Sequence, residues 1–216
     1  MNKKTTYGLI TLGVIGVGAY FLLRKRNKIS KFRQSVLDNA ERELDVWDGY
    51  VETDAEVKAD LMRYWESVGY YFTDAEYNSN SFHENNPWSA AFVSSVMKDA
   101  GAGDDFDYSP SHAAYLIYAI DNTLQYPDEP FKAYRTDEVL PEEGDIVCKN
   151  RSGGNATYDD VVVGDPLHCD IITYVGWFGV DAIGGNLSNT VKEVSYSLDS
   201  NGMLTDEHFA IIKTDL

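Results

Sequence analysis

Ser89 is the residue best placed for nucleophilic chemistry, in the segment PWSAAFVSSVMKDAG. This segment predicts a helix with Asn86 as N-cap, Pro87 at its first position and Gly101 just past its end. Ser89 would then lie in the first helical turn, directly after Trp88. Free backbone N–H groups and the helix dipole favour negative charge there, so an alkoxide and the product of its attack are easier to stabilise.

His168 is the first candidate for the base that a serine nucleophile needs. It opens the β-like run HCDIITYVG, in which strand alternation puts His168, Asp170 and Ile172 on one face. The GGN turn that ends another run offers the side-chain amide of Asn186 to orient an imidazole, and Asp170 is a second candidate for that role. Taken singly, a first-turn Ser, a strand His and a GGN turn usually have structural roles.

In combination these segments resemble a known family. WSAAFV is similar to the WCAAFV-type segment of papain-like amidases and peptidases of the NlpC and CHAP kind. PEEGDIV, HCDIITYVG and IGGNLSNTV follow in the order of that family's other segments, and the similarity covers roughly residues 34–200. The resemblance implies a papain-like α+β fold with a nucleophile at Ser89, a base at His168 and an orienter at Asn186.

The main departure from that family is that its catalytic Cys is Ser in this chain. A hydroxyl is a much weaker acid than a thiol and needs a well-placed base during attack, so the site is either retuned for Ser or inactive. The chain also resembles a Ser-bearing subgroup in which WSAAF, a downstream His and DIVC-x-x-R recur. Here the last two are His112 and Asp145–Cys148 with Arg151.

His112 has two interpretations. In SPSHAAYLIYAI it stands near a helix start, where a His often serves only as a polar cap, whereas the subgroup resemblance implies a wall of the substrate cleft. The candidate binding residues are Trp88, His112 and Asp170.

The elements that must position these residues come as helices first and strands later. Helical periodicity predicts helices over residues 29–47, 53–69 and 87–100 and one after Pro110, with a Thr53/Glu56 capping box and a loop over 73–86. This order indicates one α+β domain over residues 29–216, with helices packed on an antiparallel sheet. Strands are predicted at residues 145–150, 168–176, 181–186, 191–198 and 208–214.

Residues 7–23 form an uncharged run between basic flanks and predict one transmembrane helix, so residues 1–28 are interpreted as a membrane anchor. A cleaved secretory signal is the alternative, although no small-x-small cleavage site precedes the basic cluster. Because the resemblance is strongest to a phage and bacterial branch of the family, we expect a single-pass protein in the inner membrane of a phage's host or in the internal membrane of a virion. Basic residues after the run place the domain on the cytoplasmic side, which conflicts with a cell-wall substrate, so the side stays open.

Charge and cysteine content limit the partners. The chain has 216 residues and a net charge of −17, and residues 34–216 hold ten basic residues against all 35 acidic ones. Phosphate contacts need a basic face, so nucleic acid is excluded as a partner of this part. No metal or cofactor motif is present, and Cys148 and Cys169 are either bridged or two buried thiols.

Two functional hypotheses follow. The resemblance implies a membrane-anchored hydrolase that cleaves an amide bond in peptidoglycan, encoded by a phage for entering or lysing its host, with no cofactor. The alternative is a catalytically inactive, membrane-anchored binding or virion structural protein that keeps the fold. The Ser at position 89 favours the second hypothesis, while the presence of both His168 and Asn186 favours the first.

Overall fold

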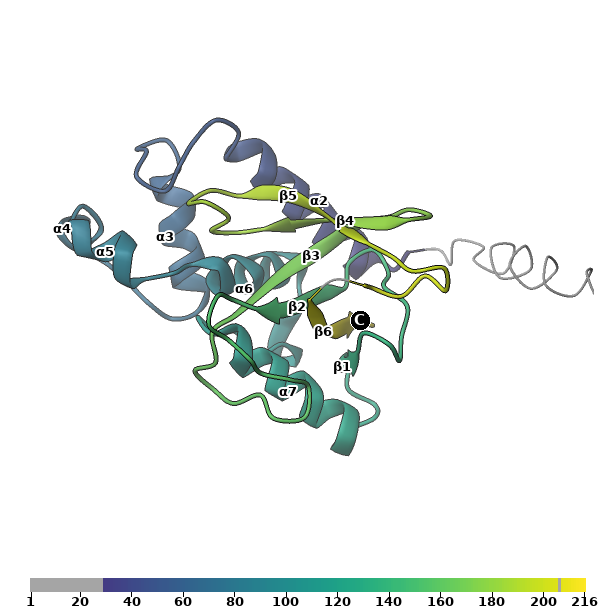
Figure 1. Cartoon of the computed structure of the whole chain (residues 1–216). Helices are drawn as coiled ribbons and strands as arrows, with labels where there is room; N and C mark the ends of the chain where they lie inside the picture. The colour runs from purple at the N-terminus through teal and green to yellow at the C-terminus, as the bar shows by residue number, and fades with distance from the viewer. Residues whose placement is uncertain (1–28, 206) are drawn as a thin grey trace, which may run out of the picture.

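The computed structural model describes residues 29–205 and 207–216, in which helices precede a six-stranded sheet (Figure 1). Every neighbouring pair of strands is antiparallel, in the order β1-β6-β2-β3-β4-β5. The predicted α+β domain with an antiparallel sheet is confirmed. The helices are α2 (Lys31–Val46), α3 (Lys58–Ser67), α4 (Asp74–Tyr77), α5 (Asn80–Asn85), α6 (Ser89–Ala100), the 3₁₀ turn η1 (Gly103–Asp105) and α7 (His112–Gln125). The strands are β1 (Phe131–Arg135), β2 (Ile146–Asn150), β3 (Leu167–Val175), β4 (Gly179–Gly184), β5 (Lys192–Ser197) and β6 (His208–Thr214).

Helix α6 is the centre of the main core. It packs between α2 and α3 and against β3, while α7 lies along β1 (Figure 1). Phe92 on this helix is 0% exposed, and Trp88, its N-cap, is 1% exposed. Trp88 also stacks on Trp47 at the end of α2, with ring centroids 4.7 Å apart. Burial of each such side chain contributes about 1.5–3 kcal/mol, and this packing fixes the start of α6 against the sheet.

Strand alternation divides the sheet's apolar residues between two clusters. On β3, Ile171 joins the main core with the helices, whereas Ile172 joins a smaller cluster with Val147 and Ile211. His168 and Asp170 share the alternation of Ile172, as the sequence predicts.

The segment between α2 and α6 differs from its prediction. α3 begins at Lys58 with no side-chain cap, so the predicted Thr53/Glu56 capping box is wrong. A capping box of the same pattern, Thr73 with Glu76, starts α4 instead, inside the stretch predicted to be a loop. The buried carboxylate of Glu52 explains why no capping box forms at Thr53. It accepts a 2.6 Å hydrogen bond from Trp88 Nε1 and so holds the turn before α3 against the start of α6.

Two further features of the sheet were not fixed by the sequence. β1 was not predicted, although its buried Phe131 and Ala133 alternate with less buried residues. Cys148 and Cys169 form a disulfide between directly paired positions of β2 and β3, which decides between the bridge and the two free thiols.

The predicted fold class needs one correction. No helix in residues 29–205 and 207–216 combines the length and apolar character needed to cross a bilayer. The domain is therefore α+β without a membrane-crossing helix in the described residues, and the predicted span, residues 7–23, lies outside them.

Candidate active site

Five chain segments meet at one end of the sheet. Because neighbouring strands are antiparallel, β2 and β4 end where β3 begins, and the starts of α6 and α7 lie at the same end. Four of them bring polar side chains, two of which come from β3, and the end of β4 brings a close backbone approach. Together they form a polar cluster of Ser89, His112, Arg151, His168 and Asp170, in which Arg151 is half-buried and the other four residues are buried.

Ser89 is the first residue of α6 and is 2% exposed. The N-cap is Trp88 and not the predicted Asn86, because the first intrahelical bond runs from Phe92 N–H to the Trp88 carbonyl. The amides of residues 89–91 therefore precede the helical hydrogen-bond ladder and remain available to an anion. Ser89 Oγ lies 2.7 Å from Nε2 of His112, the first residue of α7.

His112 is held as a neutral base. Burial lowers the pKa of its imidazole well below the ordinary value, and the neighbouring His168 and Arg151 lower it further. Its Nδ1 forms a short hydrogen bond with the hydroxyl of Tyr115, one helical turn along α7. Burial and the negative charge of Asp170 raise the pKa of Tyr115 well above its usual range, so this hydroxyl keeps its proton.

Arg151 is the second partner of Ser89, and its Nη2 donates to Ser89 Oγ across 3.3 Å. In the tautomer of His112 that carries its hydrogen on Nδ1 and donates it to Tyr115, Nε2 accepts the serine proton. In this arrangement His112 can accept the Ser89 proton during attack, as a general base must.

His168 pairs with Asp170. Its Nε2 lies 2.8 Å from Asp170 Oδ1, and Asp170 Oδ2 accepts a 2.6 Å hydrogen bond from the Tyr196 hydroxyl. Burial acts to raise the pKa of Asp170, but the bonds and charge of His168 outweigh it, so the net pKa is lowered and the carboxylate is ionised. The His168 ring lies 5.5 Å from the His112 ring, centroid to centroid. Asp170 was the second candidate for orienting His168, and this hydrogen bond is the contact that such a role requires.

The predicted trio of Ser89, His168 and Asn186 is not joined by hydrogen bonds in the described residues. Ser89 bonds to His112 and Arg151, and His168 bonds to Asp170. Asn186 is half-buried in the turn after β4, with a left-handed backbone (φ 58°).

Close packing explains the GG of the GGN motif. A Cβ at Gly184 would stand 1.8 Å from Asp170 Oδ1, and one at Gly185 would stand 2.5 Å from Phe92 Cβ. These glycines let the end of β4 approach both Asp170 and helix α6 closely.

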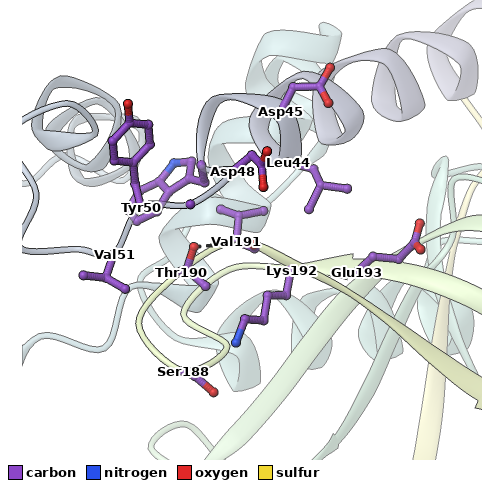
Figure 2. A pocket seen from close by; sticks show the side chains of 12 residues that line it. Leu44, Asp45, Asp48, Tyr50, Val51, Ser188, Thr190, Val191, Lys192 and Glu193 are labelled. Atoms are coloured by element: carbon purple, nitrogen blue, oxygen red, sulfur yellow. Dashed lines mark hydrogen bonds between the residues drawn. The ribbon is translucent and has the colours of Figure 1, made fainter.

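An open groove of about 830 Å³ lies apart from this cluster (Figure 2). Leu44, Tyr50 and Val51 border it on one side, and the turn with Ser188 and Thr190 borders it on the other. Trp47 lines the groove and stacks on Trp88, the residue before Ser89.

Sequence reasoning missed Tyr115 and Tyr196. Tyr115 follows His112 by three residues on a predicted helix, and the i, i+3 spacing was a usable signal for their contact. Tyr196 reaches Asp170 from β5, and nothing in the local sequence indicates that pairing. Trp88, predicted as a binding residue, is instead a core side chain bonded to Glu52.

The chain matches a bacterial family over residues 47–214, a range that contains the whole polar cluster. This chain belongs to DUF2272. The family is described as an uncharacterized protein conserved in bacteria, so membership of DUF2272 brings no activity with it. No curated protein and no solved structure matches the chain significantly.

Proposed function

We propose that this DUF2272 chain is a hydrolase that cleaves an amide bond by acyl transfer, with Ser89 as nucleophile and His112 as base. The observation that supports this most directly is the 2.7 Å contact between Ser89 Oγ and His112 Nε2 at the start of α6. Nucleophile and base within hydrogen-bond reach, with the base oriented by a third group, here Tyr115, are the features that activate a serine.

The proposed reaction has two steps. Ser89 Oγ attacks the amide carbonyl while its proton passes to His112 Nε2, and the oxyanion lies at the free amides of the α6 start. The C–N bond then breaks as His112 returns the proton to the departing amine. Water, deprotonated by His112, hydrolyses the acyl-enzyme and restores the Ser89 hydroxyl.

The substrate class comes from the resemblance to papain-like amidases and not from the geometry. We propose peptidoglycan or a similar peptide, which an extracytoplasmic enzyme would meet. The Cys148–Cys169 disulfide supports such a location, since disulfides persist in oxidising compartments and are rare in reducing ones.

One observation favours the alternative, a catalytically inactive binding protein. Ser89 is only 2% exposed and His112 only 5%, so a substrate carbonyl reaches Oγ only when the cluster opens. Under this alternative the Ser89–His112 bond is a structural link between α6 and α7.

Dye release from labelled peptidoglycan by the full-length chain tests the proposal. We expect release by the wild type, loss of release in Ser89→Ala, and a strong decrease in His112→Gln. An inert wild type alongside an active Ser89→Cys variant would contradict the serine hydrolase and favour a binding protein with a disarmed site.

A further inference from the structure

Arg151 differs from the other arginines in residues 29–205 and 207–216. Each of the others forms an ion pair with a carboxylate no more than 2.9 Å away, whereas within the described residues the Arg151 guanidinium donates to the neutral Ser89 hydroxyl and forms no ion pair. The paired arginines are Arg33, Arg42, Arg63 and Arg135.

Asp170, the acid that acts on Arg151 electrostatically, already has two other partners. Asp170 attracts Arg151 electrostatically, but its two carboxylate oxygens bond to His168 and Tyr196. Arg151 therefore carries a positive charge that no carboxylate within salt-bridge distance neutralises. In a chain with a net charge of −17, such a cation beside a nucleophile needs an explanation.

The other donors of Arg151 are not completely buried. The residue is half-buried, and none of its nitrogens is among the fully buried side-chain atoms that lack a partner. Because Nη2 donates to Ser89, the remaining N–H groups of the planar fork keep some exposure to solvent. The guanidinium thus contacts both the buried Ser89 and solvent.

We propose that Arg151 binds the carboxylate of a substrate whose scissile amide is the last one of a peptide. This inference rests on the proposed hydrolase and specifies its substrate class: a peptide with a free C-terminal carboxylate. In such a substrate only the amide nitrogen and one Cα separate the scissile carbonyl from the carboxylate, so one guanidinium beside Ser89 can contact the carboxylate during attack. The planar fork of Arg matches a carboxylate with two parallel hydrogen bonds.

The reaction then releases one C-terminal amino acid. Ser89 Oγ bonds to the carbonyl carbon of the penultimate residue, and its proton goes to His112. The C–N bond breaks as that proton moves to the nitrogen of the terminal residue, which leaves as a free amino acid. Water cleaves the acyl-enzyme and gives the shortened peptide acid.

Two N-acetylated dipeptides, alanyl-alanine in the D,D and L,L forms, test the inference when each is compared as free acid and as C-terminal carboxamide. Turnover is measured on the full-length wild type, and binding is measured by calorimetry on the full-length Ser89→Ala chain. We expect at least one free acid to have a kcat/KM at least 100-fold above that of its carboxamide, and the same preference in binding.

Substitutions at Arg151 should remove that preference. We expect Arg151→Gln to raise KM for the free acid at least 50-fold more than it raises KM for the carboxamide, with Arg151→Lys in between. Arg135→Gln is the matched control, because it removes a partly exposed guanidinium on β1, outside the cluster, and should leave both substrates unchanged.

The outcomes separate the two proposals. Selective, Arg151-dependent binding of the free acid without turnover would overturn the hydrolase and support the carboxylate site. Turnover without preference for the free acid, or equal losses on both substrates in Arg151→Gln, would overturn the carboxylate site alone. Failure of every free acid to bind at millimolar concentration would also overturn it. If Arg151→Gln fails to fold, the wild-type comparison of acid and carboxamide still decides.

Discussion

Two histidines lie within the polar cluster, and their contacts assign them different work. His112 touches Ser89 Oγ, whereas His168 bonds to Asp170. We expect His112→Gln to lower kcat/KM by on the order of 10² to 10⁴, the usual contribution of a general base, and His168→Gln to lower it less. Steady-state kinetics on labelled peptidoglycan measures both. A larger loss in His168→Gln would return the role of base to His168, as the resemblance alone implies.

The burial of His112 also makes stability depend on pH. Its pKa is held well below the unfolded value of about 6.5, so at lower pH the unfolded chain binds a proton that the folded chain does not. The free energy of unfolding should therefore fall as pH falls below about 6.5. Urea titrations at pH 7.5 and 5.5 measure this, with His112→Gln as the comparison. An equal pH dependence in the variant and the wild type would contradict it.

The sequence singles out Ser89 but not its hydrogen-bond partner. Position 89 is indicated by a hydroxyl in a first helical turn together with the resemblance of WSAAFV to a known segment, and the structure places it at the start of α6. His112 was only a candidate binding residue, because its contact with Ser89 depends on how α6 and α7 pack and spans 23 positions. Asp170 was the second choice for orienting His168, and the strand alternation that placed both on one face was the correct guide.

The approach of β4 to the cluster depends on its terminal glycines. Gly184→Ala would drive a Cβ into Asp170, where the Cβ to Oδ1 distance would be 1.8 Å. We expect the free energy of unfolding to fall by about 1–3 kcal/mol or more, as for other overpacked sites, and the His168–Asp170 pair to shift. Denaturant titration measures the loss. Gly176→Ala is the control, since its nearest contact would be 3.2 Å; an equal effect of both changes would contradict the account.

Element boundaries show where local signals fail. The pattern Thr-x-x-Glu occurs at 53–56 and at 73–76, and it makes a capping box only at the second place. Glu52 decides this through its bond to Trp88 and the hydrogen bond from the Tyr77 hydroxyl to its carbonyl. Both are tertiary contacts, and the sequence pattern does not carry them.

The disulfide links the cluster to the stability of the whole molecule. Cys148 and Cys169 are completely buried, join β2 to β3 next to His168, and close a loop with a sequence separation of 21. In the chain-entropy treatment such a bridge contributes about 3 kcal/mol. We expect the denaturation midpoint of the wild type to fall once the chain has been unfolded and refolded in the presence of reductant. The midpoint of the double variant Cys148→Ala/Cys169→Ala should be the same with and without reductant. A midpoint that reductant leaves unchanged in the wild type would contradict this.

The fold class follows from the order of helices and strands, but the sheet order does not. β6 inserts between β1 and β2, so the chain's last strand lies inside the sheet (Figure 1). Long-range pairing of this kind depends on the complete set of packed faces. The buried ion pairs of Asp145 with Arg33 and Lys213 tie the first described helix and the last strand to the start of β2.

The central claim is that Ser89 is a nucleophile activated by His112. Labelling of the full-length chain with a fluorophosphonate, followed by intact mass and peptide mapping, tests it without knowledge of the substrate. The account predicts a single adduct on Ser89 in the wild type, none in Ser89→Ala, and labelling at least 100-fold slower in His112→Gln. An unlabelled wild type, or a rate that His112→Gln leaves unchanged, would contradict it.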